Sequence, residues 1–219
     1  ESYCLVSLEY IMTYKAIIWD FGGVITSSPF EAFNNFESQN NLPLDIIRTI
    51  NSENPDSNAW AKFERNDISV DQFDELFAKE AEKKGFNITG KQIIGLLSGK
   101  IRPFMVHFLK DLKGKYKLGC ITNNVQSDNQ SKQDYSKESS EAMTLFDHVI
   151  ESSLIGIRKP DPRIYHMSCD ALEVEPKECI YLDDLGVNLK PAKAIGMTTI
   201  KVIDPNIAIS QVKEFLGIR

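Results

Sequence analysis

Polar side chains that could act together in catalysis occur at four separate points of the chain. They are Asp20, the pair Thr122 and Asn123, Lys159, and the pair Asp183 and Asp184. A carboxylate can attack a phosphoryl group as a nucleophile, while a lysine and a hydroxyl can neutralise and hydrogen-bond its oxygens. Three carboxylates at one place would repel one another unless a cation neutralised them, and Mg²⁺ is the ordinary choice for hard oxygen ligands. These residue types predict a Mg²⁺-assisted phosphoryl-transfer site with Asp20 as the nucleophile.

Each of these groups has an ordinary structural interpretation when it is taken alone. A carboxylate after a strand is often only a helix cap, a Thr-Asn-Asn segment is an ordinary turn, and a Lys-Pro-Asp-Pro segment is most often a solvated loop. The functional interpretation is favoured because all of them occur in one order, each at a strand end or in the expected loop.

Short apolar runs separated by helical patterns must position these groups. The runs are Ala16–Asp20, Tyr116–Thr122, Cys179–Asp183 and Thr198–Val202, with a weaker fifth at His148–Ile150. Strands that alternate with helices predict an α/β fold, a three-layer Rossmann-like parallel sheet with helices on both faces. Because the carboxyl ends of parallel strands lie along one edge, we expect the polar groups to converge there.

The gap between the first two runs is too long for a single crossover, and its patterns are helical almost throughout. One helix is expected after Pro29, a second over 45–50, and a third over 71–84 with Asp71 as its N-cap. We therefore expect a helical cap at residues 27–100, inserted into an α/β core formed by residues 13–26 and 101–219. Residues 1–12 are treated as an N-terminal extension, since Met12 would make a natural start.

Composition and charge exclude several classes of protein. The formal net charge of −6 argues against a nucleic-acid-binding or membrane-binding surface, and no apolar run approaches the length of a membrane span. The 4 cysteines form no CxxC pair and no zinc spacing, which is typical of reduced thiols. We expect a cytoplasmic enzyme, monomeric or homodimeric, whose partner is a small phosphorylated metabolite.

One stretch, Gln126–Glu141, contains almost nothing apolar and follows the end of the second strand. Its composition predicts a mobile surface loop. A disordered excursion without a role and a gating or contact role at the site both fit this composition.

The same elements resemble the haloacid dehalogenase-like (HAD) hydrolase superfamily, most of whose members are phosphatases. The motifs that carry the resemblance are Asp20-Phe21-Gly22-Gly23-Val24, Thr122-Asn123, Lys159-Pro160 and Asp183-Asp184. Within the superfamily, segments 146–152, 158–165 and 181–192 most resemble the N-terminal phosphatase domain of soluble epoxide hydrolase. The resemblance covers the chain from Tyr14 onward and implies the same core and helical cap.

Carried over by position, the resemblance implies a role for each motif residue. Mg²⁺ would be held by Asp20, the backbone carbonyl of Gly22 and Asp184, with Asp183 nearby through water. Thr122 and Asn123 would bind the phosphoryl group or substrate, and Lys159 would neutralise nucleophile and phosphate. Asn188 lies where a helix residue supports the metal waters, with simple capping or packing as the alternative.

Gly22 departs from the family pattern, which has an aspartate there that protonates the leaving alcohol and later activates water. Glycine cannot transfer a proton, and a positioned general acid or base contributes about 10²–10⁴-fold. We therefore expect a phosphohydrolase that is slow or biased to good leaving groups, such as glycosyl-1-phosphates, acyl phosphates or aryl phosphates. Water or a cap residue, Glu64, Arg65 or Asp67, could partly substitute, although surface charge is the simpler role for all three.

Two alternatives stay open. A metal-independent haloacid dehalogenase-type hydrolase also lacks the second aspartate, but retention of both Asp183 and Asp184 counts against it. A catalytically impaired phosphometabolite-binding or interaction module is made plausible by Gly22 alone. Halide release that survives EDTA would support the first, and an Asp20→Asn variant indistinguishable from wild type would support the second.

Overall fold

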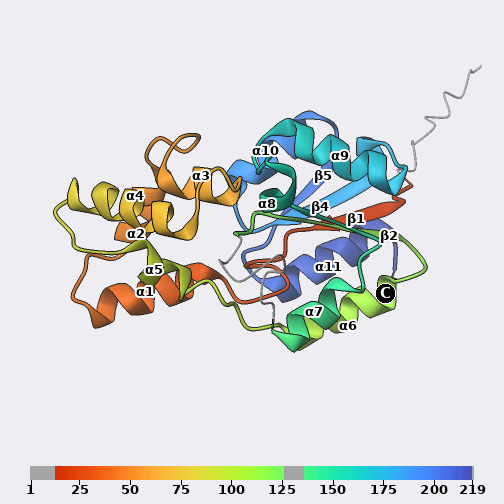
Figure 1. The fold of residues 1–219 in the computed structure, drawn as a ribbon. Helices are drawn as coiled ribbons and strands as arrows, with labels where there is room; N and C mark the ends of the chain where they lie inside the picture. The colour runs from red at the N-terminus through yellow and green to blue at the C-terminus, as the bar shows by residue number, and fades with distance from the viewer. Residues whose placement is uncertain (1–12, 126–135, 219) are drawn as a thin grey trace, which may run out of the picture.

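The core of the protein is a parallel sheet of five strands in the order β3-β2-β1-β4-β5 (Figure 1). The computed structural model describes residues 13–125 and 136–218. The strands are β1 (Ala16–Trp19), β2 (Lys117–Thr122), β3 (His148–Glu151), β4 (Cys179–Asp183) and β5 (Thr198–Lys201). The sheet confirms the predicted α/β, Rossmann-like architecture, and the weak fifth run forms its edge strand β3.

Helices cover both faces of this sheet (Figure 1). On one face lie α6 (Pro103–Leu112), α7 (Lys137–Met143) and α11 (Pro205–Leu216). On the other lie α8 (Ser152–Ile155), α9 (Pro162–Leu172), the short 3₁₀ helix at Pro176–Glu178 and α10 (Gly186–Ala194). Each face is therefore sealed, as a parallel sheet requires.

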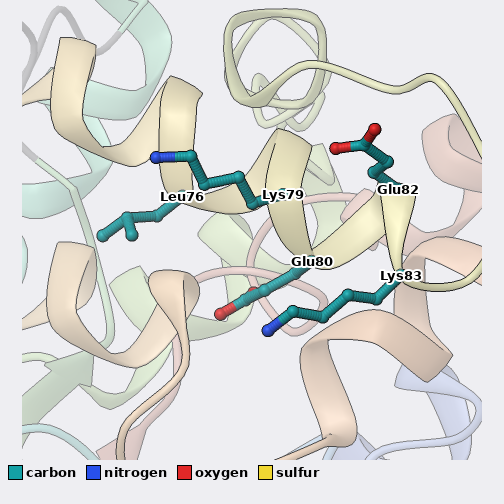
Figure 2. A pocket seen from close by; sticks show the side chains of 5 residues that line it. All are labelled: Leu76, Lys79, Glu80, Glu82 and Lys83. Carbon is teal, nitrogen blue, oxygen red and sulfur yellow. The ribbon is translucent and has the colours of Figure 1, made fainter.

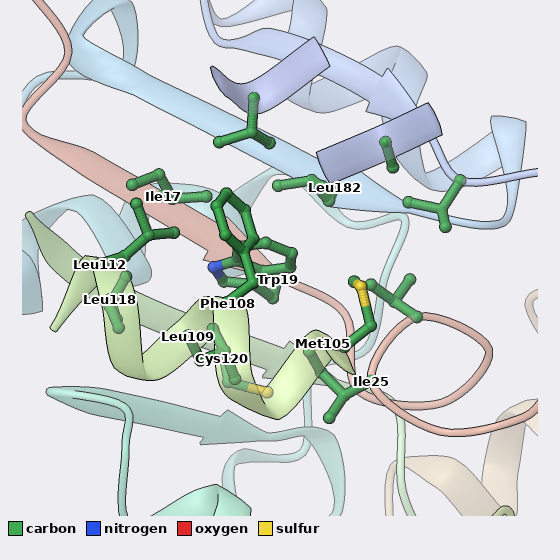
Figure 3. Packing of buried hydrophobic residues seen from close by; sticks show 14 of the residues in the cluster. Ile17, Trp19, Ile25, Met105, Phe108, Leu109, Leu112, Leu118, Cys120 and Leu182 are labelled. Atoms are coloured by element: carbon green, nitrogen blue, oxygen red, sulfur yellow. The ribbon is translucent and has the colours of Figure 1, made fainter. Parts of the chain in front are cut away.

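Alternation along β1 divides its side chains between the two layers of core. Ile17 and Trp19 pack toward α6, where the Trp19 and Phe108 rings meet edge to face at 6.1 Å (Figure 3). Ala16 and Ile18 face the α9 and α10 layer. All four β1 side chains are fully buried, so the strand that carries Asp20 at its end is firmly held.

Five helices form a separate cap between β1 and α6 (Figure 1). They are α1 (Pro29–Gln39), α2 (Ile46–Ser52), α3 (Ala59–Glu64), α4 (Val70–Glu82) and α5 (Gly90–Ile94). The cap has its own apolar core, in which the Phe63 and Phe73 rings stack with centroids 4.5 Å apart.

The two segments that join cap and core run antiparallel beside each other. Thr26 and Ile101 form an isolated bridge, Ser27 N–H donates to Lys100 O at 2.8 Å, and Arg102 N–H donates to Ile25 O at 2.9 Å. The chain thus leaves the core and re-enters it at neighbouring points.

Two local predictions were wrong. The N-cap of α4 is Ser69 rather than Asp71, because Ser69 and Gln72 form a reciprocal capping box at 2.9 and 3.2 Å. The predicted loop over 126–141 also contains the start of α7, whose first turn is capped by Ser136. Residues 126–135 of that loop and the predicted extension 1–12 lie outside the described residues. Over the described ranges, no helix is long and apolar enough to cross a membrane.

Candidate active site

Three carboxylates meet at the carboxyl edge of the sheet. Asp20, Asp183 and Asp184 each place one oxygen within 4.8 Å of the other two. The cause is the pairing of β1 with β4, which sets Trp19 opposite Leu182, so that the next residues along the two chain segments, Asp20 and Asp183, lie side by side. Asp20 N–H continues the ladder by donating to Leu182 O at 2.8 Å. The predicted convergence of these acids is therefore present in the structure.

Lys159 lies between two of these acids. Its Nζ is 2.8 Å from both Asp20 Oδ1 and Asp183 Oδ2, and its side chain is 1% exposed. Burial alone would lower the pKa of Lys159, but the carboxylates of Asp183 and Asp20 outweigh it and raise that pKa above its ordinary value. The site therefore keeps a fixed positive charge next to Asp20 Oδ1.

Asp183 is fully buried and its oxygens are taken by protein donors. Besides Lys159, it accepts from Tyr181 Oη at 2.5 Å, Leu185 N–H at 2.8 Å and Asn188 Nδ2 at 3.1 Å. Asp183 thus orients Lys159, and the Asn188 amide serves Asp183. The sequence reasoning missed Tyr181, although its position two residues before Asp183 on one strand places both on the same face.

Burial disfavours the ionised forms of Asp20 and Asp184. Burial raises the pKa of Asp20 well above its usual range, with Asp183 and Asp184 adding to the shift and Lys159 opposing it. Burial and the charge of Asp183 raise the pKa of Asp184 to about 6. A divalent cation bound to these carboxylates would relieve the repulsion, because it favours the ionised form of each.

The two glycines after Asp20 differ in what they allow. Gly23 has a left-handed φ of +77°, and a Cβ there would lie 2.3 Å from Asp184 Oδ2. Glycine is therefore needed at Gly23 for the approach of Asp184. A Cβ on Gly22 would meet nothing within 4 Å, and the Gly22 backbone lies outside the left-handed region. Neither packing nor backbone geometry demands glycine at position 22.

The donor set fits Mg²⁺. Asp20 and Asp184 belong to one cluster of carboxylates and offer oxygen atoms, the ligand type that Mg²⁺ prefers, while the expected part of the Gly22 carbonyl stays a prediction. Burial first, and neighbouring carboxylates second, raise the pKa values of Asp20 and Asp184, and a bound cation would favour the ionised form of both.

Thr122 is the buried last residue of β2, the other neighbour of β1, and Asn123 follows it. The Asn123 side chain holds the main chain of Lys159 from both sides. Its Oδ1 accepts from Lys159 N–H at 2.8 Å, and its Nδ2 donates to Lys159 O at 3.0 Å, beside the cis Lys159-Pro160 peptide. Asn123 therefore positions the lysine, while its predicted contact with substrate stays a prediction.

Glu64 is not the surface charge that the sequence suggested. It is 7% exposed at the end of α3, and its Oε2 accepts from Arg158 Nε at 2.6 Å. Its Oε1 accepts from Trp60 Nε1 at 2.9 Å. By contrast, Arg65 and Asp67 form a surface ion pair at 2.8 Å. No sequence spacing could pair Glu64 with Arg158, which is 94 residues away.

Of the two pockets described, neither is lined by these site residues. One, of about 380 Å³, lies on α4 of the cap (Figure 2). It is lined by Leu76, Lys79, Glu80, Glu82 and Lys83. The pocket on α4 is therefore separate from the acid cluster at the sheet edge.

Curated relatives of the chain differ widely in length. Acyl-CoA dehydrogenase family member 10 of Mus musculus is 33% identical over 212 residues, covering 94% of this chain and 19% of that protein. Bifunctional epoxide hydrolase 2 of Sus scrofa is 30% identical over 220 residues, covering 95% of this chain and 40% of that protein. Sesquiterpene phosphatase astK of Aspergillus oryzae is 28% identical over 208 residues, covering 94% and 98%. The chain thus spans less than half the length of the first two.

Structure comparison agrees on the fold. A HAD family enzyme from Bacteroides thetaiotaomicron, solved in complex with magnesium and inorganic phosphate, superposes with a TM-score of 0.56 at 21% identity. The match covers 86% of this chain and 93% of that one. The sequence also matches the family model of the haloacid dehalogenase-like hydrolases over residues 14–196. This match confirms the resemblance seen in the motifs: the chain belongs to the haloacid dehalogenase-like hydrolases, a family in which its relatives include named phosphatases.

Proposed function

We propose that this protein is a Mg²⁺-dependent phosphohydrolase that acts on a small phosphorylated metabolite through an aspartyl-phosphate intermediate. The observation that carries the proposal is the position of Lys159 Nζ, 2.8 Å from Asp20 Oδ1 in a cluster of three carboxylates. A phosphatase among the relatives and a structural neighbour bound to magnesium and phosphate support it.

Each site residue has a separate part in the proposed reaction. Asp20 attacks the phosphorus atom, the bond from phosphorus to the leaving oxygen breaks, and Asp20 becomes phosphorylated. Water then attacks the same phosphorus and releases inorganic phosphate, which restores the Asp20 carboxylate. Lys159 neutralises the phosphoryl oxygens throughout, and the Thr122 hydroxyl hydrogen-bonds them. Bound Mg²⁺, held by Asp20, Asp184 and the Gly22 carbonyl, would add positive charge that keeps both acids ionised.

In the proposed reaction the leaving group departs with little help from a proton donor. Gly22 offers no proton, and Glu64 is committed to Arg158 and Trp60. Substrates whose leaving group departs with little protonation are therefore preferred, which favours glycosyl-1-phosphates, acyl phosphates and aryl phosphates over alkyl phosphates. The cluster of three carboxylates counts against a metal-independent dehalogenase. Such an enzyme uses no cation, whereas three carboxylates at one place favour a cation that neutralises them.

A substrate panel tests the proposal. Purified protein is incubated with aryl, acyl, glycosyl-1- and alkyl phosphates, with Mg²⁺ or with EDTA, and inorganic phosphate is measured. We expect release that requires Mg²⁺ and is lost in Asp20→Asn, but kept in Asp67→Asn, which alters only a surface pair. Acid-quenched protein should carry one phosphoryl group on the peptide that contains Asp20.

The same panel includes 2-haloacids. The proposal fails if no phosphate ester is hydrolysed, or if halide release in EDTA is the only activity found.

A further inference from the structure

We propose that Glu64 is a positioning residue that ties the cap to the loop carrying Lys159, so that cap placement and lysine placement are coupled. The proposal rests on the proposed function of the site, because Lys159 is the group being placed. Glu64 belongs to the cap helix α3, whereas the residues it contacts across the interface belong to the core (Figure 1).

Three core elements meet Glu64. Its Oε2 accepts from Arg158 Nε at 2.6 Å and lies 3.4 Å from Asn123 Nδ2. Its main-chain oxygen accepts from Ser152 Oγ at 2.7 Å, at the start of α8. The side chains of Arg158 and Glu64 are 18% and 9% exposed, so their ion pair is largely removed from water.

The contacts lead directly to the catalytic lysine. Arg158 is its chain neighbour, and Arg158 Nη1 also donates to Pro55 O in the cap at 3.0 Å. Asn123 holds both main-chain polar groups of Lys159, as described above. Glu64 therefore contacts the residue before Lys159 and the residue that clamps Lys159.

The geometry favours a role for the Glu64–Arg158 ion pair in fixing the position of the cap relative to the core. A buried ion pair adds little net stability compared with apolar packing, and its best-attested use is to specify one arrangement among several. The cap is joined to the core covalently only at 26–27 and 100–101, and a second attachment far along the chain would select one cap position. Glu64 and Arg158 provide that attachment at the catalytic loop.

Hydrogen exchange and kinetics test the proposal on the full chain. Glu64→Gln removes the charge but keeps an acceptor for Trp60, and Asp67→Asn is the matched control because it breaks an exposed ion pair in the same segment. We expect faster amide exchange over 157–161 in Glu64→Gln, including the Lys159 amide. With an aryl phosphate and Mg²⁺, kcat/KM should fall about 10- to 100-fold, the range for a residue that orients a catalytic group. The melting temperature should fall, because Arg158 loses its partner in a largely buried position, so exchange over 157–161 is compared with exchange over β1 and β4 in the same variant.

A double-variant cycle gives the sharpest outcome. If Glu64 acts through Arg158, then Arg158→Gln shows the same loss, and combining it with Glu64→Gln adds little further. Losses that multiply, or unchanged exchange over 157–161 in Glu64→Gln, would overturn the proposal.

Two further results are informative. If Glu64→Gln does not fold, Arg158→Gln alone is compared with Asp67→Asn by the same exchange measurement. If wild type hydrolyses no phosphate ester, the proposed function fails, but the exchange result still decides whether Glu64 orders the Lys159 loop.

Discussion

Replacing Gly22 by aspartate should convert a slow site into a faster one. The substitution places a carboxyl group two residues after Asp20, the proposed nucleophile. The structure accepts it, because a Cβ at position 22 has no neighbour within 4 Å and the backbone there lies outside the left-handed region. The Cβ of the new side chain would therefore displace no described atom, and the carboxyl group that it carries can transfer a proton.

The expected gain in activity equals the contribution of the general acid or base that Gly22 cannot supply. A positioned general acid or base is worth about 10²–10⁴-fold, or about 3–5 kcal/mol of barrier. The gain should approach that range for an alkyl phosphate, whose leaving group needs a proton. It should be small for an aryl phosphate, whose leaving group departs readily as an anion. The ratio of the two activities thus reports proton transfer specifically.

Steady-state assays of both esters at saturating Mg²⁺ measure this ratio. Gly22→Asn is the control, since asparagine has nearly the same shape as aspartate but cannot act as a general acid or base. Asp20→Asn combined with Gly22→Asp should be inactive, which shows that the gain still depends on the nucleophile. The pH profile of Gly22→Asp on the alkyl ester should gain a limb absent from wild type.

An equal gain in Gly22→Asp and Gly22→Asn would refute the reasoning. So would a Gly22→Asp variant with no gain on the alkyl ester, because proton transfer would then not limit the wild-type rate or another residue would already supply it.

Other substitutions test the charge balance and geometry of the same cluster. Because the pKa of Asp184 is raised from 3.8 to about 6, folding favours its protonated form, and metal-free wild type should lose up to about 3 kcal/mol as pH rises through this interval. In EDTA, Asp184→Asn should therefore be more stable than wild type at pH 7.5 but not at pH 3.5, as measured by chemical denaturation; lower stability at pH 7.5 would contradict the assignment. Gly23→Ala should weaken Mg²⁺ binding in calorimetry, since its Cβ would lie 2.3 Å from Asp184 Oδ2, and unchanged affinity would mean that Asp184 can move aside freely. Lys159→Met should lose phosphate release and about 3–5 kcal/mol of stability at neutral pH, because two buried carboxylates lose their partner, and a variant as stable as wild type would contradict this role for Lys159.

The convergence of the site could be predicted from sequence because it depends on strand ends. Apolar runs ending in Asp20 and Asp183 predict a parallel sheet, and a parallel sheet brings its carboxyl ends to one edge. The helical cap could be predicted for a similar reason, since its apolar spacing is local. Both inferences need only the chain's own periodicity.

The residues that position Lys159 could not be predicted in this way. Helix spacing predicts only a surface charge at Glu64, because it gives no information about a core residue 94 positions away. Asn123 was assigned to substrate by its motif, while its actual hydrogen bonds to Lys159 depend on how two loops meet. The N-cap of α4 was misplaced because Ser69 and Asp71 are both good capping residues, and the capping box at Gln72 decides between them.

The paired crossing at Thr26 and Ile101 has a consequence for how this protein can be altered. Since the chain exits and returns at adjacent points, residues 27–100 form an insertion whose ends already meet. A cap from another family member could be exchanged here without changing the connectivity of the sheet. Such a chimera would keep the five strands and the acid cluster at their edge, provided the graft supplies an acidic partner for Arg158.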